Sequence, residues 1–389
     1  MKIPRFYQDL GQYIQPNKVL VIYGPRRVGK TTLLTDFLAN CKFKYKLDSG
    51  DNIKVQEILS SQDFNLIKEY ASGYELIAID EAQKIPNVGQ GLKILVDQIP
   101  NIRVIATGSS SFELSGQVGE PLTGRKNTLI LYPIAQLELA SLYNNYELKE
   151  KLNEWLVFGA YPEVITVSNK DALFAGKQEK IKILEELVHS YLLKDILEIE
   201  QVKGSKVLLD LLRLIAFQVG NEVSFSELAT QIGIDTKTVA RYLDLFEKSF
   251  ILYNLRGFSK NLREEITRKS KYYFYDNGVR NAIISNFNDI ESRNDIGALW
   301  ENFLIIERLK KNSYYGIFSN NYFWRTWSQK EIDFVEEREG KLFGYEFKWS
   351  EKIDKKIGKS WLEIYPEASL EIITPQNYFD FIGLNLKKD

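Results

Sequence analysis

One stretch of the sequence decides the fold: Gly24-Pro25-Arg26-Arg27-Val28-Gly29-Lys30-Thr31-Thr32. Two glycines bracket four residues and are followed by a lysine and a hydroxyl, which is the pattern of a phosphate-binding loop. The apolar run 19–23 before the loop predicts a buried strand, and residues 31–39 after it predict a helix. We therefore expect the loop amides to face the phosphates of a nucleotide, with Lys30 at the β- and γ-phosphates and the Thr31 hydroxyl on Mg²⁺.

A second apolar run, residues 76–79, is followed by two acids, Asp80 and Glu81. In a chain that also carries a phosphate-binding loop, the first acid suits the surroundings of the Mg²⁺ ion. The second acid suits the polarisation of a water molecule for attack on the γ-phosphate. Without the upstream loop, the same pattern would be a strand that ends in solvated acids.

Two later positions are candidates for the same site. The run 103–106 is followed by Thr107 and Ser109, and either hydroxyl could sense or position the attacking water. Ordinary turn chemistry explains these residues equally well. Arg125 follows shortly after, and an arginine that reaches a neighbouring subunit's phosphate would stabilise charge in the transition state. The alternative for Arg125 is simple solvation at the surface.

Composition narrows the chemistry further. Lysine and arginine total 51 against 52 acids, for a formal net charge of −1, so no overall basic field indicates a nucleic-acid partner. The single cysteine, Cys41, and the single histidine, His189, exclude an intrachain disulfide, multi-cysteine zinc sites and histidine clusters. No apolar run approaches the ~18 residues of a membrane span, and the N-terminus has no hydrophobic signal core. We therefore expect no membrane partner and a cytoplasmic location.

The residue pattern changes character along the chain. Over 17–134 short apolar runs alternate with amphipathic helices, which predicts a buried parallel sheet and an α/β fold. Residues 135–200 have a helical pattern, and 206–259 predict helices followed by a small hairpin. From 294 onward the pattern predicts a long helix, several strands, a second helix and a last strand at 370–374.

Residues 18–133 resemble the AAA-type (AAA+) ATPase domain of a widespread bacterial and archaeal family. The motifs that carry the resemblance are residues 24–33, Ile-Asp-Glu-Ala-Gln-Lys at 79–84, Thr-Gly-Ser-Ser-Ser at 107–111, Gly-Ala-Tyr-Pro-Glu at 159–163 and Ser-Tyr-Leu-Leu-Lys-Asp-Ile at 190–196. The resemblance implies ATP and Mg²⁺ as cofactors, and a homo-oligomer, with a hexameric ring as one arrangement. Family members carry a C-terminal region long described only as of unknown function.

Together these patterns predict an α/β protein with four parts. They are a P-loop ATPase core (1–134), a helical lid or linker (135–205), a winged-helix domain (206–293) and a PD-(D/E)xK nuclease-like α/β domain (294–389).

The winged-helix prediction rests on residues 224–258. A helix ends near Gly233, Asp235 or Thr236 caps a second helix over 237–248, and a strand follows. Helical spacing places four residues of the second helix in the core, namely Val239, Tyr242, Leu243 and Phe246. Basic groups that could contact DNA phosphates are Lys237, Arg241, Lys260, Arg263, Arg268, Lys269 and Lys271, together with the hydroxyl of Thr238. The alternative is a lid or protein-contact module.

The last part of the chain resembles the PD-(D/E)xK nuclease core. Asp333 precedes Glu346 and Lys348, which lie two apart on one expected strand and so leave the same face. The resemblance implies Asp333 and Glu346 as Mg²⁺ ligands, and Glu301 as a further ligand or a holder of the metal's water. Lys348 would orient the attacking water or stabilise the phosphate. The alternative is a solvated face of alternating charges.

Three functions remain open at this point. The first is an ATP-driven machine acting on DNA, whether double-stranded, branched or single-stranded. The second is a nucleotide-switched signalling or scaffold ATPase whose C-terminal domain binds protein. The third is a degenerate nuclease that only grips nucleic acid.

Overall fold

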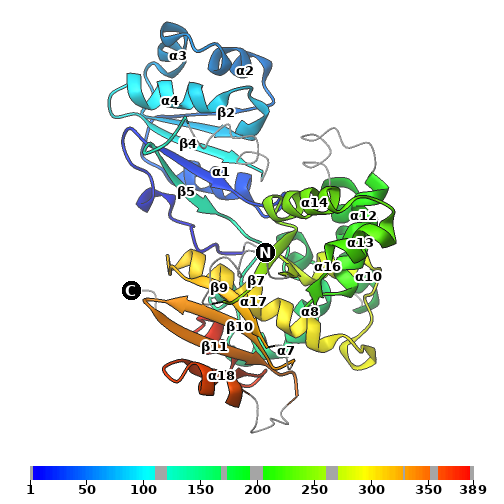
Figure 1. Cartoon of the computed structure of the whole chain (residues 1–389). Helices are drawn as coiled ribbons and strands as arrows, with labels where there is room; N and C mark the ends of the chain where they lie inside the picture. The colour runs from blue at the N-terminus through cyan, green and yellow to red at the C-terminus, as the bar shows by residue number, and fades with distance from the viewer. Residues whose placement is uncertain are drawn as a thin grey trace.

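We describe the chain from a computed structural model, which covers residues 3–109, 121–167, 173–192, 205–259, 270–326, 329–350 and 358–385. Within these ranges the chain is an α/β protein with one parallel sheet and one mixed sheet. The predicted α/β class with a parallel P-loop sheet is thereby confirmed. Figure 1 shows the parallel sheet in the upper part of the molecule and the mixed sheet in the lower part, with most of the middle helices to one side.

The parallel sheet carries the phosphate-binding loop. Its strand order is β2 (Tyr45–Ser49), β3 (Leu76–Asp80), β4 (Arg103–Gly108), β1 (Val19–Tyr23) and β5 (Lys126–Ile130). The helical segments of this part are η1 (Leu10–Gln12), α1 (Lys30–Asn40), α2 (Ile53–Ser60), α3 (Phe64–Ala71), η2 (Ala82–Lys84) and α4 (Val88–Gln98).

Strand β1 is buried along its whole length because helices cover both faces of the sheet. Leu20 and Ile22 pack into the same hydrophobic cluster as Leu34 of α1. Val21 points to the other face, where its cluster includes Leu92 of α4. This alternation is the two-residue period of a strand, and it explains why the run lacks polar residues.

Helices dominate the middle of the chain. They are α6 (Gln136–Leu139), α7 (Asn145–Glu150), α8 (Leu152–Phe158), α9 (Pro162–Thr166), α10 (Leu173–Glu186), the π-helix η3 (Leu187–Leu192), α12 (Ser205–Phe217), α13 (Phe225–Ile232), α14 (Thr236–Lys248), α16 (Asn277–Ile283) and η4 (Ile290–Ser292). Every residue of α16 is buried, so this short helix lies at the centre of the region.

The mixed sheet joins two parts of the chain that the sequence separates. Its order is β12 (Ser369–Ile373), β11 (Lys341–Phe347), β10 (Glu331–Arg338), β9 (Asn320–Arg325), β7 (Leu252–Gly257), β8 (Ser270–Phe274) and β6 (Glu222–Val223). The helices beside it are α17 (Ile296–Tyr314), α18 (Lys359–Ile364) and α19 (Tyr378–Ile382). Because β7 pairs with β9 in parallel, the sheet continues across the domain boundary predicted between 293 and 294.

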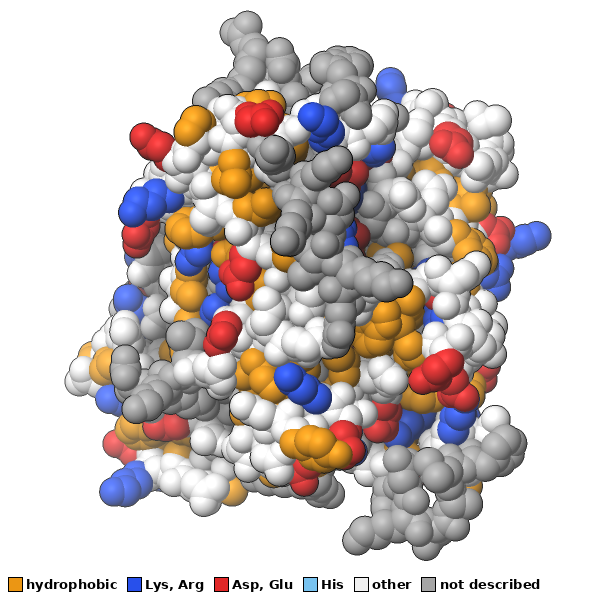
Figure 2. Space-filling view, turned by 90° about the horizontal axis from the view of Figure 1, so that it is seen from below, with side chains coloured by type: hydrophobic (Ala, Val, Ile, Leu, Met, Phe, Trp, Pro, Cys, Tyr) orange, Lys and Arg blue, Asp and Glu red, His pale blue; other side chains and the backbone are white. Residues whose placement is uncertain are grey.

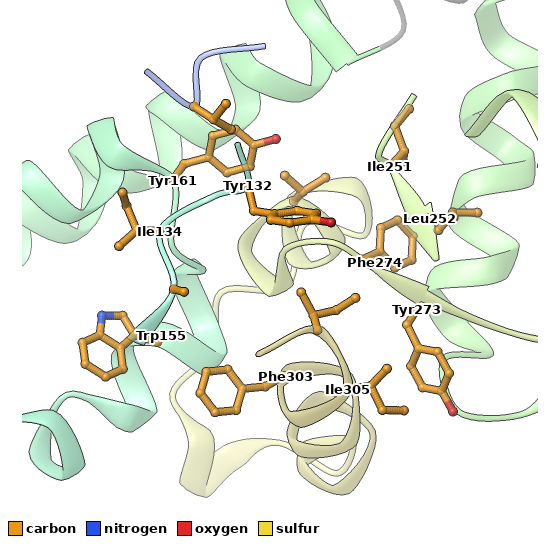
Figure 3. Packing of buried hydrophobic residues seen from close by; sticks show 14 of the residues in the cluster. Tyr132, Ile134, Trp155, Tyr161, Ile251, Leu252, Tyr273, Phe274, Phe303 and Ile305 are labelled. Carbon is orange, nitrogen blue, oxygen red and sulfur yellow. The ribbon is translucent and has the colours of Figure 1, made fainter. Parts of the chain in front are cut away.

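One hydrophobic cluster connects the parallel sheet to the rest of the molecule. It extends from α1 through the middle helices to α19. Figure 3 shows part of it, with Tyr132 from the segment after β5 above Phe303 of α17 and Trp155 of α8 at one side. Among the helices in the described ranges, none combines the length and apolar character needed to cross a membrane.

Gly159 marks a close approach between two distant segments. It has a φ of 69°, and a Cβ built on it would lie 2.0 Å from a carboxylate oxygen of Asp276. The same carboxylate accepts hydrogen bonds from the backbone N–H of Ala160 at 2.6 Å and of Val279 at 3.1 Å. Position 159 therefore requires glycine for space as well as for backbone conformation.

We expect Gly159→Ala to lower the free energy of unfolding by about 1–3 kcal/mol, because the new methyl group would displace Asp276 from both amides. Chemical denaturation measures the change. The matched control is Gly297→Ala in α17, where nothing lies within 4 Å of the added Cβ. The control should be unchanged or gain up to about 1 kcal/mol. Equal stability of the two variants would contradict the assigned contact.

Candidate functional site

The phosphate-binding loop connects the end of β1 to the start of α1. The backbone N–H of Leu131 donates to Tyr23 O at 2.8 Å, which holds the strand end against the segment after β5. Gly24 lies so close to that segment that a Cβ would meet Leu131 O at 2.1 Å. The first glycine of the motif is therefore required for packing as well as for loop curvature.

Lys30 lies inside the loop. Its side chain is buried, and its ammonium donates to Gly24 O at 2.9 Å and to Pro25 O at 2.7 Å. These carbonyls belong to the loop that is predicted to surround the phosphates. The Lys30 ammonium is thus held within the loop, at the first turn of α1. Anions are favoured there because the backbone N–H groups at a helix N-terminus lack partners within the helix.

Side chains from helix α1 and strand β4 meet the Asp80 carboxylate at the end of strand β3. The Thr31 hydroxyl donates to one carboxylate oxygen of Asp80 at 2.8 Å. The Thr107 hydroxyl donates to the other oxygen, and the backbone N–H of Glu81 lies 3.2 Å from that hydroxyl. The contact is possible because β4, which carries Thr107, lies between β3 and β1. Hydroxyl and carboxylate oxygens are the ligands that Mg²⁺ prefers, so Thr31 and Asp80 fit that ion.

Glu81 has a neighbour that the sequence analysis missed. Glu81 lies in the left-handed region with a φ of 52°, and its carboxylate accepts from Gln83 Nε2 at 2.6 Å. The amide oxygen of Gln83 in turn accepts from the backbone N–H of Ser109 at 3.3 Å. Gln83 therefore connects Glu81 to Ser109, which were both predicted to act at the γ-phosphate. Its position two residues after Glu81 is the feature of the sequence that could have identified it.

Arg27 points away from the loop. It has a φ of 61°, and its guanidinium pairs with Glu163 of α9 and Glu186 of α10, each at 3.0 Å. The Arg27 side chain thus contacts the middle helices, and the place of Arg27 in a cofactor-binding loop over Gly24 to Thr32 stays a prediction.

Arg5 is a second residue that the sequence analysis missed. Its buried guanidinium donates to Val28 O of the loop at 2.5 Å, to Tyr132 O at 2.7 Å and to Glu138 at 2.9 Å. Burial alone would lower the pKa of Arg5, but the Glu138 carboxylate more than offsets this, so the pKa is raised. The phosphate-binding loop is therefore hydrogen-bonded, through Val28 O, to the permanently charged guanidinium of Arg5.

A cavity of about 450 Å³ opens beside the loop and α1. The N-terminal segment, α1 and α9 all contribute to its wall. Its lining residues are Ile3, Pro4, Arg5, Gln8, Asp9, Val28, Gly29, Thr32, Leu33, Asp36, Phe37, Asn40, Ile134, Pro162 and Thr166. Pro162 belongs to the motif at 159–163 that the sequence analysis singled out.

Arg125 lies at the start of β5, whereas the loop follows the end of β1. Because the two strands are parallel, Arg125 and the loop lie at opposite ends of the sheet within one chain. The Arg125 guanidinium pairs with Asp97 at 2.6 Å. Its predicted action on a neighbouring subunit is untested and stays a prediction.

The α13–α14 segment has the predicted geometry. Gly233 ends α13 with a φ of 79°, and the Asp235 carboxylate caps α14 by accepting from the backbone N–H of Thr238 at 2.9 Å. The Thr238 hydroxyl also donates to Asp235. The four residues predicted to face the core are buried: Val239, Tyr242, Leu243 and Phe246.

Only part of the predicted basic surface is described. Lys237 and Arg241 are exposed on α14. Lys260, Arg263, Arg268 and Lys269 lie outside the described residues. The prediction for Lys271 is wrong, because this side chain is 1% exposed and pairs with Glu331 and Glu301. Figure 2, which views the molecule from below, shows basic and acidic side chains interspersed on that face.

The C-terminal acids lie on neighbouring elements, as predicted. β10 and β11 are antiparallel, and the Asp333 carboxylate accepts from the backbone N–H of Phe347 at 2.8 Å. The Lys348 ammonium donates to Glu346 at 2.9 Å. Burial raises the pKa of Glu346 to about 7, with Asp333 adding to the increase and Lys348 opposing it. Burial likewise raises the pKa of Asp333.

Glu301 of α17 completes this group of acids. It accepts from the Tyr273 hydroxyl at 2.6 Å, and burial raises its pKa to about 7 although Lys271 opposes the increase. Within the described ranges, however, no set of three or more His, Cys, Asp or Glu is arranged to hold a metal ion. The predicted metal site of Glu301, Asp333 and Glu346 is therefore not assembled, because lysine ammonium groups pair with two of these acids.

Comparisons with known proteins match three segments of the chain to family models. Residues 16–140 match the family model of an AAA domain, which supports the predicted ATPase core. Residues 149–290 match a domain of unknown function (DUF8612), and residues 296–379 match another (DUF4143).

The chain is similar over most of its length to proteins of bacteria and archaea. It is 27% identical to the uncharacterized protein Rv2008c of Mycobacterium tuberculosis, over 85% of this chain and 70% of that protein. An uncharacterized protein of Haemophilus influenzae is also 27% identical, with 85% and 82% covered. The uncharacterized protein MJ1544 of Methanocaldococcus jannaschii is 25% identical, with 84% and 74% covered.

A solved structure of a single-residue variant of Thermotoga maritima RuvB aligns with 61% of this chain and 81% of its own length at 16% identity. Its TM-score of 0.27 is too low to support any statement about this chain.

We expect half-buried Glu247, near the end of α14, to make the stability of the protein depend on pH. Burial raises the pKa of Glu247 to about 7 from an ordinary 4.5. A carboxyl whose pKa is raised on folding stabilises the folded state less as pH rises from 4.5 through 7. We expect the Tm of Glu247→Gln to increase relative to that of the native protein over this interval. Glu227→Gln on the exposed side of α13 is the control, and thermal unfolding at pH 4.5 and 8 measures both. A constant difference for Glu247→Gln would contradict the raised pKa.

Proposed function

We propose that the protein is an AAA-type ATPase that hydrolyses ATP with Mg²⁺. The observation that carries the proposal is the convergence of Thr31, Asp80 and Thr107 from α1, β3 and β4 beside the buried ammonium of Lys30. This arrangement offers a charged donor for phosphates and two oxygen ligands for Mg²⁺ at one edge of a parallel sheet. The AAA domain match over residues 16–140 supports it.

Each group has a place in the proposed reaction. Lys30 would turn from the loop carbonyls to the β- and γ-phosphates, and Thr31 and Asp80 would hold Mg²⁺, which neutralises phosphate charge. Glu81, supported by Gln83, would orient the attacking water. Ser109 would report on the γ-phosphate through Gln83.

The nucleoside would occupy the cavity beside α1. That cavity begins at Gly29 and Thr32 of the loop and is walled by Pro4 and Pro162. Its volume of about 450 Å³ is within the range of small-molecule sites. Because Pro162 belongs to α9, binding there would bring the middle helices into contact with the nucleotide.

A second proposal concerns DNA and rests on the α13–α14 segment. The order α12, β6, α13, α14, β7, β8, with β8 paired to both β6 and β7, supports the proposal of a winged helix. Lys237 and Arg241 are exposed on α14, where they could contact phosphates. The protein would then be an ATPase that acts on DNA. The competing proposal is a nucleotide-switched scaffold that uses the same surface to bind protein.

Homo-oligomeric assembly stays a prediction. We do not extend the proposal to nucleic-acid cleavage, because the acids at 301, 333 and 346 do not form a metal-binding group among the described residues.

We expect Lys30→Ala to lower the ATP turnover number by at least about 10²-fold, because the loop would lose its charged donor to the phosphates. A phosphate-release assay with Mg²⁺ measures turnover. The matched control is Lys84→Ala, which removes an exposed lysine of the same domain that pairs with Asp51. The control should keep near-native turnover. Native turnover by the folded Lys30 variant would overturn the proposed site.

We expect the double variant Lys237→Glu, Arg241→Glu to bind DNA at least about tenfold more weakly, with a salt dependence reduced by about two phosphate contacts. Fluorescence anisotropy over a salt series, with double-stranded, branched and single-stranded DNA, measures both. Lys248→Glu, at the other end of α14, is the control for charge alone. Unchanged DNA affinity and ATPase stimulation across all forms would favour the scaffold proposal.

A further inference from the structure

A cluster of buried and half-buried charges lies where strands β8, β10 and β11 meet helix α17. We call it the β8–α17 charge cluster. Its acids are Glu301, Glu331, Asp333 and Glu346, and its bases are Lys271 and Lys348. The ATPase proposal does not use this cluster, and the sequence assigned its acids to a metal.

Lys271 is the most deeply buried base of the cluster, at 1% exposed. Its ammonium donates to Glu331 and lies 3.6 Å from a carboxylate oxygen of Glu301. The backbone that carries it is β8, which is hydrogen-bonded to β7 and β6 and precedes the C-terminal region in sequence. A base from the middle region thus extends into acids from the C-terminal region.

The same strand contributes a second contact to Glu301. The hydroxyl of Tyr273, two residues after Lys271 and on the same face of β8, donates to Glu301 at 2.6 Å. Figure 3 shows Tyr273 beside helix α17, with its hydroxyl turned away from Phe274. Glu301 is therefore held by two groups of β8 at once.

Electrostatic interactions place Lys271 between acids of two elements. Burial alone would lower the pKa of Lys271, but Glu301, Glu331 and Asp333 more than offset this, and the pKa is raised. The ammonium therefore stays charged at neutral pH. The second base of the cluster, Lys348, pairs with Glu346 and also interacts with Asp333.

This arrangement explains why the acids do not form a metal site. Divalent cations of the Mg²⁺ class need several oxygen ligands that converge on one point. Here Lys271 already occupies the place between three of the acids: its ammonium donates to Glu331, lies 3.6 Å from Glu301 and is attracted by Asp333. The fourth acid, Glu346, pairs with Lys348.

We infer that the Lys271 ammonium takes the place of a divalent cation in the β8–α17 charge cluster. Lys271 neutralises the acids of the cluster, and its ion pairs connect β8 of the middle region to α17 and β10. The cluster does not bind a metal ion while Lys271 is present. Removal of this one charge leaves the carboxylates of Glu301, Glu331 and Asp333 around the position of the lost ammonium. A set of three carboxylates of this kind attracts Mn²⁺ or Mg²⁺.

The test is Mn²⁺ binding to the full chain without nucleotide, measured by isothermal titration calorimetry. The variants are Lys271→Met and Asp333→Asn, alone and combined, with Lys341→Met as a matched control that removes an exposed lysine from β11. We expect the native protein and Asp333→Asn to give the same isotherm. We expect Lys271→Met to bind Mn²⁺ at least about tenfold more tightly, and the double variant to lose that gain.

A second measurement covers the case in which Lys271→Met folds poorly. Its Tm should be lower than that of the native protein and should rise when Mn²⁺ is added, whereas the Tm of Lys341→Met should not respond. If Lys271→Met cannot be purified in a folded state, Mn²⁺ titrations of the native protein and of Asp333→Asn still test the inference. A Mn²⁺ site in the native protein that Asp333→Asn removes would overturn the inference. So would a folded Lys271→Met that binds Mn²⁺ no more tightly than the native protein.

Discussion

The buried carboxylate of Asp276 is the contact that connects the segment leaving the parallel sheet to the middle helices, and the arrangement of these two parts depends on it. It caps α16 through Val279 and accepts the backbone N–H of Ala160, whose carbonyl in turn accepts from Ile134 at 2.8 Å. Ile134 is the last residue of the predicted ATPase core. The Asp276 carboxylate therefore connects the end of that core, through Ala160, to helix α16. Burial raises the pKa of Asp276 to about 6, because the cost of desolvating the charge outweighs the hydrogen bonds from the Ala160 and Val279 amides, which oppose the increase. Pro162, two residues after Ala160, then reaches the cavity beside the loop.

The parts of the fold that could be predicted are those whose cause is local. The loop at 24–31 needs only its own glycines, lysine and flanking periodicity. The buried face of α14 follows from helical spacing, so Val239 and Phe246 were placed correctly from sequence. The order of Asp80 and Glu81 after a strand was sufficient to place Asp80 near Thr31, because parallel strands end at one edge.

What could not be predicted depends on pairs far apart in sequence. Lys271 looked like one of several bases in a basic segment, and only the pairing of β7 with β9 shows that β8 lies beside the C-terminal acids. Arg5 carries no motif, and its role comes from a contact 23 residues away with Val28. In both cases a charged residue typical of a surface is buried because its partners come from another region.

One helix relates the two charged sites of the molecule. At the C-terminal end of α17, the Tyr314 hydroxyl lies 3.4 Å from Glu138, which holds Arg5 under the phosphate-binding loop. Near the other end, Glu301 accepts from Tyr273 in the β8–α17 charge cluster. A helix of 19 residues is about 28 Å long and stiff over that length. The loop and the cluster are therefore joined by one stiff helix, which takes part in a tyrosine–carboxylate hydrogen bond near each end, so the position of either site constrains the other through α17.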